Sequence, residues 1–340
     1  MPIATKTIEG FAAQKEKSSL QPYKYEAHPL GDFDIEVEIT HCGICHSDLH
    51  LINNDWNISK YPLLPGHEII GHIKQKGKGV TELNIGQRVG IGWQSNSCRE
   101  CEWCHQGEEN LCLTQESTCV GRPGGFAKSI IVDHHFAFRI PENLKSENAA
   151  PLLCGGATVF SPLLQHGVDG TYRIGVFGIG GLGHLALQFA RAFGCEVFAF
   201  SSSMAKENEA KELGASHYIS TADSANLASL KNSLDMILYT SSHITDFSQL
   251  MGLLRPKGKL CLLGVPEDGK VNLPIVDFID GRKTVCGSNI ASPPVIQKML
   301  EFAARHNIVA KTELFPMSEV NAALDKLKSN QIHYRAVLCN

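Results

Sequence analysis

The sequence predicts an α/β protein with two domains, a β-rich domain and a doubly wound parallel-sheet domain. Two observations lead to this fold class. Short strand candidates separated by Gly, Pro and Asn turns fill the first part of the chain, whereas apolar strands alternate with helix-length segments from about residue 172 onward. A chain of 340 residues is long enough to bury two such cores.

The first strand of the β-rich part is predicted from strict alternation. Phe33, Ile35, Val37 and Ile39 alternate with charged or polar residues, which is the period-two pattern of a half-buried strand. Further short strand candidates are residues 67–73, 88–93 and 126–133.

The parallel-sheet domain is predicted from a buried strand followed by a glycine turn and a helix. Residues 173–180 form the apolar run, after which Leu182, Leu185, Phe189 and Phe193 share one helical face. A polar-faced helix ends at Gly214. Further strand candidates are residues 195–201, 216–220, 234–240, 258–265 and 283–288.

The domain boundaries follow from the same alternation. After the last of these strands comes a helical segment at residues 295–308, and residues 334–340 form a closing strand expected to return to the first domain. We therefore predict an outer domain of residues 1–152 and 291–340, with a dinucleotide-binding type of domain at residues 153–290 inserted into it.

Composition excludes several classes of function. The chain is 43% hydrophobic with a net charge of −4, so neither a nucleic acid nor another polyanion is an expected partner. Glycines and polar residues interrupt the most apolar stretch, residues 174–190, and no membrane span is expected. No secretory signature is present, so we expect a cytoplasmic location. Twelve clustered cysteines then suggest metal binding rather than disulfides.

The strongest motif is a run of four closely spaced cysteines, Cys98, Cys101, Cys104 and Cys112. Four thiolates at this spacing can close a tetrahedron around one zinc ion and leave no open coordination position. The alternative is four free cysteines in a loop. The spacing favours a structural zinc site.

A second motif, Gly178-x-Gly180-x-x-Gly183, directly follows a strand and opens a helix. In this context, the glycines predict a dinucleotide site in which the pyrophosphate approaches the backbone at a helix N-terminus. The alternative is that the glycines serve only to pack the turn.

The residues after the second strand of that domain indicate which dinucleotide is bound. An NAD site carries Asp or Glu there, ~20 residues after the glycines, to hold the ribose hydroxyls. Here the strand ends in Ser201, Ser202 and Ser203, with Lys206 beyond. These hydroxyls and the ammonium can donate to a 2′-phosphate, so we predict NADP(H). The alternative role of the serines is to cap the next helix.

A third group of residues could hold a catalytic zinc, which takes three protein ligands and keeps one position open. The candidates are Cys42 or Cys45, His67 and Cys154, each beside glycines. Spacing alone does not choose between Cys42 and Cys45. A lone buried cysteine is more often a small apolar residue.

These motifs, in this order, resemble those of the zinc-dependent alcohol dehydrogenases in the medium-chain dehydrogenase/reductase superfamily. The segments that carry the likeness are HCGICHSDLH, GHE, the four-cysteine loop, LLCGGATV and GIGGLGH, within residues 33–338. The serine run and the C-terminal segment resemble the cinnamyl-alcohol-dehydrogenase-like branch. Within it, the chain is most similar to bacterial NADPH-dependent broad-range aldehyde reductases. The implied fold is a GroES-like catalytic domain plus a Rossmann domain.

The resemblance implies roles for the residues of the catalytic site. Cys45, His67 and Cys154 would bind the catalytic zinc, with Glu68 behind the ion and Asp48 orienting His67. Ser47 and His50 would form a proton relay by way of the nicotinamide ribose. Cys42 would then be a packing residue.

The resemblance also implies a set of cofactor and substrate residues. Those expected to contact the cofactor are His46, Thr158, Gly178, Gly180, Gly181, Leu182, Gly183, Ser201, Ser202, Ser203, Lys206, Val265, Ser288 and Arg335. Trp56 and Trp93 would line the substrate channel and favour flat or aliphatic aldehydes. The alternative for Arg335 is a charged residue at a strand edge. The alternative for His46 is an exposed side chain without a role. The alternative for the two tryptophans is that both are core residues.

The implied activity is the interconversion of aldehydes and primary alcohols with NADP(H), by a homodimer that carries two zinc ions per chain. Dimerisation is expected at the strand in residues 283–290. One alternative is an NAD-linked alcohol or polyol dehydrogenase of the same superfamily, which the serine run disfavours. Another is a non-catalytic NADPH-binding protein, and a third is a zinc-free quinone reductase. The complete ligand and relay set disfavours both. The loop after the structural cysteines is shorter than in plant lignin enzymes, so specificity for cinnamaldehyde is not expected.

Overall fold

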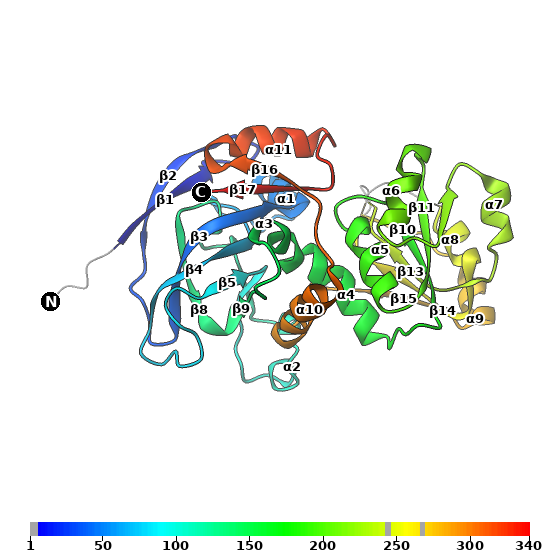
Figure 1. Cartoon of the computed structure of the whole chain (residues 1–340), viewed down its shortest axis with the longest axis horizontal. Coiled ribbons are helices and arrows are strands. Elements are labelled where there is room, and N and C mark those ends of the chain that lie inside the picture. The colour runs from blue at the N-terminus through cyan, green and yellow to red at the C-terminus, as the bar shows by residue number, and fades with distance from the viewer. Residues whose placement is uncertain (1–5, 242–245, 266–268) are drawn as a thin grey trace. The chain divides into compact units, whose positions relative to one another are not determined.

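The computed structural model describes residues 6–241, 246–265 and 269–340, and it divides the chain into two compact units (Figure 1). Unit 1 comprises residues 1–154, 291–305 and 309–340, and unit 2 comprises residues 155–290 and 306–308. The chain therefore leaves the first unit after residue 154 and returns to it near residue 291, apart from residues 306–308. The predicted change of domain lay at residues 152/153 and 290/291.

Unit 1 is built on a seven-stranded sheet. Its strands run in the order β16 (Thr312–Pro316), β17 (Arg335–Cys339), β3 (Asp34–Ile44), β4 (Glu68–Lys76), β5 (Arg88–Ile91) and β9 (Ala137–Arg139), and β8 (Ser129–Asp133) also pairs with β3. Two small antiparallel pairs accompany it, β1 (Lys6–Ala13) with β2 (Leu20–Ala27) and β6 (Gln94–Asn96) with β7 (Glu116–Ser117). The helices are α1 (His46–Asn53), α2 (Glu102–His105), α3 (Ser146–Ala149), α10 (Pro293–His306) and α11 (Val320–Lys328).

The closing strand β17 lies inside this sheet, next to the first long strand. It runs parallel to β16 and antiparallel to β3, pairing Val337 with Gly43 and Leu338 with Cys42. The last strand of the chain thus belongs to the sheet of unit 1. Strand β3 is longer than the alternation of residues 33–39 indicated, because it pairs with β17, β4 and β8 along its length.

Unit 2 contains a six-stranded parallel sheet. Its order is β12 (His217–Ser220), β11 (Glu196–Ser201), β10 (Arg173–Phe177), β13 (Leu234–Tyr239), β14 (Leu254–Leu262) and β15 (Thr284–Gly287). The helices of this unit are α4 (Gly155–Gln165), α5 (Gly183–Ala192), α6 (Glu207–Glu212), α7 (Ser224–Ser229), α8 (Phe247–Leu253) and α9 (Ile275–Gly281). If the six strands are numbered along the chain, their order across the sheet is 3-2-1-4-5-6, which is the order of a dinucleotide-binding fold.

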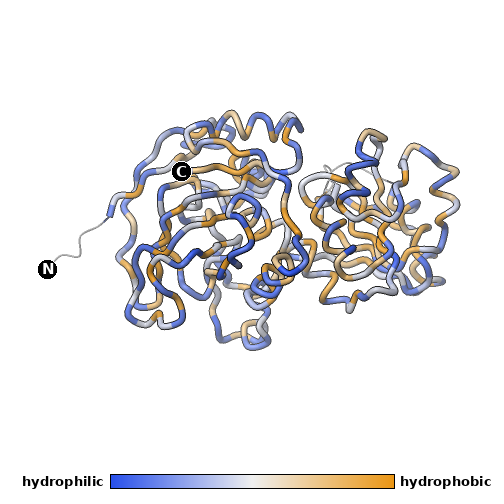
Figure 2. Tube along the Cα trace, in the orientation of Figure 1, coloured by the Kyte–Doolittle hydropathy of each residue, from blue (hydrophilic) through white to orange (hydrophobic). Residues whose placement is uncertain are grey.

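The apolar runs of the sequence become the interiors of these sheets (Figure 2). All six residues of β13 are buried, as expected for a parallel strand covered on both faces. The predicted α/β fold class is confirmed. None of the helices within the described residues is long and apolar enough to cross a membrane.

Candidate active site and two clusters of potential metal ligands

The first cluster brings together one ligand atom from each of Cys45, His67, Glu68 and Cys154, all within 4.8 Å of one another. Cys45 is the N-cap of α1, His67 directly precedes β4, and Cys154 follows a short 3-10 helix at Ala150–Leu153. Cys42, which lies on β3 three residues before Cys45, is instead fully buried in the hydrophobic core. The structure thus groups Cys45, and not Cys42, with the other candidate ligands.

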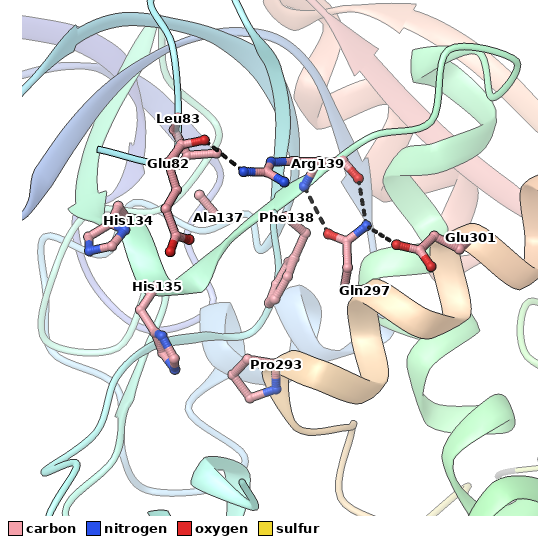
Figure 3. A pocket seen from close by; sticks show the side chains of 10 residues that line it. All are labelled: Glu82, Leu83, His134, His135, Ala137, Phe138, Arg139, Pro293, Gln297 and Glu301. Carbon is pink, nitrogen blue, oxygen red and sulfur yellow. Dashed lines mark hydrogen bonds between the residues drawn. The ribbon is translucent and has the colours of Figure 1, made fainter. Parts of the chain in front are cut away.

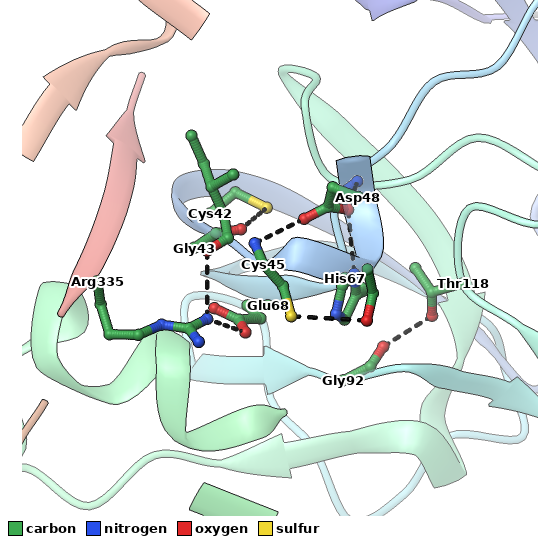
Figure 4. A network of polar contacts seen from close by, with 12 residues as sticks. Cys42, Gly43, Cys45, Asp48, His67, Glu68, Gly92, Thr118 and Arg335 are labelled. Carbon is green, nitrogen blue, oxygen red and sulfur yellow. Dashed lines mark hydrogen bonds and ion pairs between the residues drawn. The ribbon is translucent and has the colours of Figure 1, made fainter. Parts of the chain in front are cut away.

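Asp48 holds two of these ligands in place (Figure 4). Its Oδ1 accepts from Nδ1 of His67 at 3.1 Å and from the backbone N–H of Gly66 at 3.0 Å. Its Oδ2 accepts from the backbone N–H of Cys45 at 2.9 Å. Because Nδ1 is bound to Asp48, the imidazole offers Nε2 to a metal, the arrangement by which carboxylates orient metal-bound histidines.

A divalent cation fits the unpaired groups of this cluster. Among the described residues, buried Nε2 of His67 and Oε2 of Glu68 have no hydrogen-bond partner of ordinary geometry. Such orphaned buried atoms are costly unless something else binds them. The thiol of Cys154, which donates to Cys45, holds the pKa of Cys45 well below its usual range. A thiolate and a neutral imidazole are the ligands that zinc requires.

Glu68 and Arg335 form a buried ion pair beside the cluster. Burial raises the pKa of Glu68 to about 7, although the guanidinium of Arg335 opposes this shift. A second N–H of the guanidinium group donates to the backbone oxygen of Ile44 at 3.2 Å. Arg335 is therefore not an exposed charge at a strand edge, since it is 5% exposed between β16 and β3.

Two indole rings cover the side of the cluster where His67 lies. The ring of Trp93 meets the His67 ring edge-on with centroids 5.0 Å apart, and Trp56 lies against Trp93 at 6.2 Å. Trp56 is 38% exposed, so it is not a core residue. The rings form an apolar, partly exposed wall next to the metal ligands.

Ser47 and His50 lie on α1 directly after Cys45. The Cys45 thiol lies 3.6 Å from Oγ of Ser47. Nδ1 of His50 lies 2.8 Å from a carboxylate oxygen of Asp55, and both side chains are partly exposed. Asp55 is a polar partner that the sequence analysis missed, although it stands next to Trp56 in the printed sequence.

Cys119 is a second residue that the sequence analysis missed. It is fully buried, it interacts with the side chain of His67, and it forms a compact group with His67 and Asp48. Its backbone is left-handed, with a φ of 65°, and only the Gly- and Pro-rich segment that follows it hinted at an unusual turn.

The second cluster contains the four predicted cysteines. The Sγ–Sγ distances are 3.6 Å for Cys98–Cys112, 3.6 Å for Cys101–Cys104 and 3.9 Å for Cys98–Cys104. Four sulfurs bound tetrahedrally at the usual Zn–S length of ~2.3 Å lie about 3.8 Å apart. The cluster thus already has the dimensions of a closed zinc site. The backbone N–H of Cys98 also lowers the pKa of Cys112 to about 6, which favours the thiolate.

In unit 2 the three glycines of the loop after β10 each meet a different spatial demand. Gly178 has a φ of +91°, and a Cβ on Gly183 would lie 1.9 Å from the Gly178 carbonyl oxygen. A Cβ on Gly180 would meet nothing within 4 Å, so the space above this residue is open to a ligand. Gly178 thus permits the tight turn, Gly183 permits close packing of the helix on the strand, and Gly180 leaves room for a pyrophosphate to approach the backbone.

The serine run and Lys206 lie next to that loop. The ammonium of Lys206 donates to the backbone oxygen of Ile179 at 2.8 Å, which ties the end of β11 to the glycine loop. Oγ of Ser201 accepts from the backbone N–H of Ser203 at 3.3 Å. Val265 and Ser288 follow β14 and β15 at the same carboxyl edge of the sheet, where ligands of open α/β sheets bind.

The remaining predicted residues are distributed between the two units. Gly181 and Leu182 belong to the same loop as the three glycines, and Thr158 lies on α4. His46 is the first residue of α1 in unit 1, where its side chain is exposed.

Figure 3 shows a separate polar pocket in unit 1 that shares no lining residue with either cysteine cluster. Its polar groups bond to one another. The backbone N–H of Arg139 donates to Gln297 at 3.1 Å, and Gln297 donates to Glu301 at 3.2 Å.

Fold and site together define the class of protein. Residues 31–142 match the alcohol dehydrogenase GroES-like domain, and residues 181–305 match the zinc-binding dehydrogenase domain. The chain belongs to the zinc-binding alcohol dehydrogenase family, a family of oxidoreductases.

Individual relatives cover nearly the whole chain. It is 41% identical over 331 residues to the aldehyde reductase AdhA of Synechocystis, which covers 97% of this chain and 98% of that protein. It is 42% identical over 340 residues to cinnamyl alcohol dehydrogenase 2 of Arabidopsis thaliana, covering 97% of this chain and 90% of that one. A mannitol dehydrogenase of Petroselinum crispum is 41% identical over 329 residues, or 94% of this chain and 97% of that one.

Solved structures give the same result. A cinnamyl alcohol dehydrogenase from Sorghum bicolor superposes with a TM-score of 0.93 at 38% identity, over 98% of both chains. A cinnamyl alcohol dehydrogenase from Helicobacter pylori in complex with NADP(H) superposes with a TM-score of 0.91 at 32% identity, over 99% of both chains.

Proposed function

We propose that this protein is a cytoplasmic, homodimeric, NADP(H)-dependent aldehyde reductase with two zinc ions per chain. The observation that carries the proposal is the grouping of Cys45, His67 and Cys154 beside an apolar wall of tryptophans. The similarity to an aldehyde reductase at 41% identity supports the substrate class. When bound, zinc supplies a Lewis acid for the carbonyl oxygen, and NADPH supplies the hydride.

The residues of the chain provide ligands, orientation and a path for the proton. Asp48 fixes the ring of His67, and Arg335 keeps Glu68 in place behind the ligands. Trp93 and Trp56 offer apolar surface to a flat or aliphatic aldehyde and disfavour charged substrates.

The proton for the product alcohol is assigned to Ser47 and His50. Ser47 lies next to the ligand Cys45, and the carboxylate of Asp55 holds Nδ1 of His50. That contact leaves Nε2 of His50 to exchange protons with solvent. Ser47 would then donate a proton to the substrate oxygen, and His50, which can exchange protons with solvent, would restore the proton of Ser47.

The two zinc assignments are tested by metal analysis of purified variants. Cys45→Ser is expected to reduce zinc from two ions to one per chain and to abolish turnover, because the remaining ligands bind the ion weakly. Cys104→Ser also removes one ion, but it acts on the closed cluster and lowers thermal stability. An unchanged zinc count in Cys45→Ser would contradict the catalytic assignment.

The preference for NADP(H) is assigned to the serines at the end of β11 and to Lys206. Ser201→Asp introduces a carboxylate that repels a 2′-phosphate and accepts from ribose hydroxyls. The ratio of kcat/KM for NADPH to that for NADH is expected to fall at least about tenfold, which is ~1.4 kcal/mol. Ser229→Asp, on exposed α7, is the matched control. If the ratio does not move, the phosphate binds elsewhere.

A polyol dehydrogenase is the competing function, because a mannitol dehydrogenase is equally similar. Oxidation of mannitol with NAD, measured beside reduction of benzaldehyde with NADPH, separates the two. The serine run favours the second reaction.

The dimer is assigned to the open edge of the sheet at β15. Beside it, α9 exposes Ile275, Val276 and Ile279. Thr284→Pro places a proline in this edge strand, and it should convert a dimer into a monomer in sedimentation experiments. A wild-type protein that sediments as a monomer at micromolar concentration would contradict this part of the proposal.

A further inference from the structure

Unit 2 contains a cysteine pair that the zinc chemistry does not use. Cys261 on β14 and Cys286 on β15 face each other in register across the parallel ladder. Adjacent strands lie ~4.8 Å apart, and disulfides join residues whose Cα atoms are ~4.4–6.8 Å apart. Each thiol also shifts the pKa of the other, so the two side chains lie close enough to interact. Ladder geometry thus permits a bond between the sulfurs without unfolding the sheet.

The two thiols differ in their access to solvent. Cys261 is fully buried, whereas Cys286 is partly exposed on the edge strand of the sheet. Pairing of β15 with a second copy would use backbone groups along the strand, while the side chains stay on the faces of the sheet. One thiol can therefore meet a small solute first, and its buried neighbour can react with it next.

The surroundings of Cys286 favour its thiolate. Nε2 of His166, just after α4, lies 3.4 Å from Sγ of Cys286. Lys259 on β14 adds a positive charge nearby. The neighbouring Cys261 thiol is the main cause that lowers the pKa of Cys286 to about 6, and the same interaction raises the pKa of Cys261 well above its usual range. The thiolate is the nucleophilic form of cysteine.

We propose that Cys286 and Cys261 form an oxidant-responsive pair, in which Cys286 is the peroxide-reactive thiol and Cys261 is the resolving thiol. The Cys286 thiolate attacks a hydroperoxide and breaks its O–O bond, giving a sulfenic acid and, after protonation, an alcohol or water. The Cys261 thiol then displaces the sulfenic hydroxyl as water and forms the disulfide. Two thiols are oxidised and one hydroperoxide is reduced.

The test uses the zinc-loaded enzyme, in which the ligand cysteines are protected by metal. The protein is treated with a small excess of hydrogen peroxide, free thiols are alkylated, and proteolytic peptides are mapped by mass spectrometry. We expect one linked pair of peptides, containing positions 261 and 286, that dithiothreitol separates. The link should be absent from Cys286→Ser and unchanged in Cys339→Ser, the control with a partly exposed cysteine.

Two further variants test the order of the steps. In Cys261→Ala the resolving thiol is gone, so a dimedone adduct should accumulate on Cys286. His166→Gln should slow alkylation of Cys286 by iodoacetamide. In the wild type at pH 7, this alkylation should be about threefold or more faster than that of Cys339. The rate should level off above pH ~7 for Cys286 but continue to rise for Cys339, since burial raises the pKa of Cys339.

Oxidation of Cys286 to a sulfinic acid without a linked peptide in the wild type would overturn the proposal. So would a Cys286 that is alkylated no faster than Cys339. Neither outcome depends on aldehyde reduction, because both are read from peptides.

Discussion

Asp48 shows how one side chain can organise a site of several ligands. Its two oxygens accept three hydrogen bonds, from Cys45, Gly66 and His67. Two of these donors, Cys45 and His67, are candidate ligands, and the third, Gly66, is the residue before His67. The carboxylate is fully buried, so these bonds are what compensates for its lost hydration.

Replacing Asp48 by Asn tests this role without changing the size of the side chain. The amide presents only one acceptor oxygen, so either the backbone N–H of Cys45, or His67 together with the backbone N–H of Gly66, loses its partner. We expect zinc affinity to fall ~10–100-fold. Competition with a zinc chelator measures the affinity. Asp32→Asn, at an exposed carboxylate paired with Lys78, is the control and should leave the affinity unchanged. Equal zinc affinity in both variants would contradict the role of Asp48.

The sequence allowed some residue roles to be predicted but not others. Closely spaced ligands such as the four cysteines could be found, because their spacing itself carries the chemistry. The pairing of Glu68 with Arg335 could not, because the two are 267 positions apart and meet only through the pairing of β17 beside β3. The contact of Cys119 with His67 also depends on folding, since nothing near it in the sequence signals a partner.

At the scale of elements, the turn from β10 into α5 separates two roles of glycine. Gly183 lies against the Gly178 carbonyl oxygen, so it serves the packing of the helix on the strand. A Cβ on Gly180 would meet open space, so the absence of a side chain there leaves room for a ligand. The motif alone did not distinguish these roles.

Two alanine substitutions separate them experimentally. Gly183→Ala should destabilise the fold by about 2 kcal/mol or more, because the methyl group overlaps backbone atoms. Gly180→Ala should leave the thermal midpoint nearly unchanged but weaken NADPH binding at least about tenfold, because the methyl group fills the space of the pyrophosphate. Fluorescence titration and thermal unfolding provide the two readouts. Tight NADPH binding by Gly180→Ala would show that the open space is not the phosphate site.

The ends of helices and strands were predictable where the hydrophobic pattern of the sequence agrees with the strand pairing in the sheet. Residues 173–177 form a strand as expected, because the four buried residues after Arg173 are apolar, as in a covered parallel strand. The helix after it spans Gly183–Ala192, so Leu182 and Phe193 of the predicted face are its N-cap and C-cap. Strand β14 begins at Leu254, earlier than residue 258, because it pairs with β13 before Gly258. Such pairings are tertiary and leave no local signal.

At the scale of the whole molecule, the chemistry is divided between two units that the chain builds in an interrupted order. Unit 1 holds both cysteine clusters, and unit 2 holds the glycine loop, the serine run and the redox pair. The sequence analysis predicted a closing strand at residues 334–340, and in the structure β17 spans Arg335–Cys339 and lies in unit 1. Its position next to β3 could not be predicted, since the order of strands in a sheet is not encoded locally.

The most direct test of this account is the initial rate of benzaldehyde reduction by the zinc-loaded enzyme with NADPH and with NADH, beside the Cys45→Ser variant. We expect a rate with NADPH at least about tenfold above that with NADH, and no rate in the variant. The account would be contradicted by protein that retains two zinc ions per chain but fails to oxidise NADPH when benzaldehyde, an aliphatic aldehyde or cinnamaldehyde is supplied.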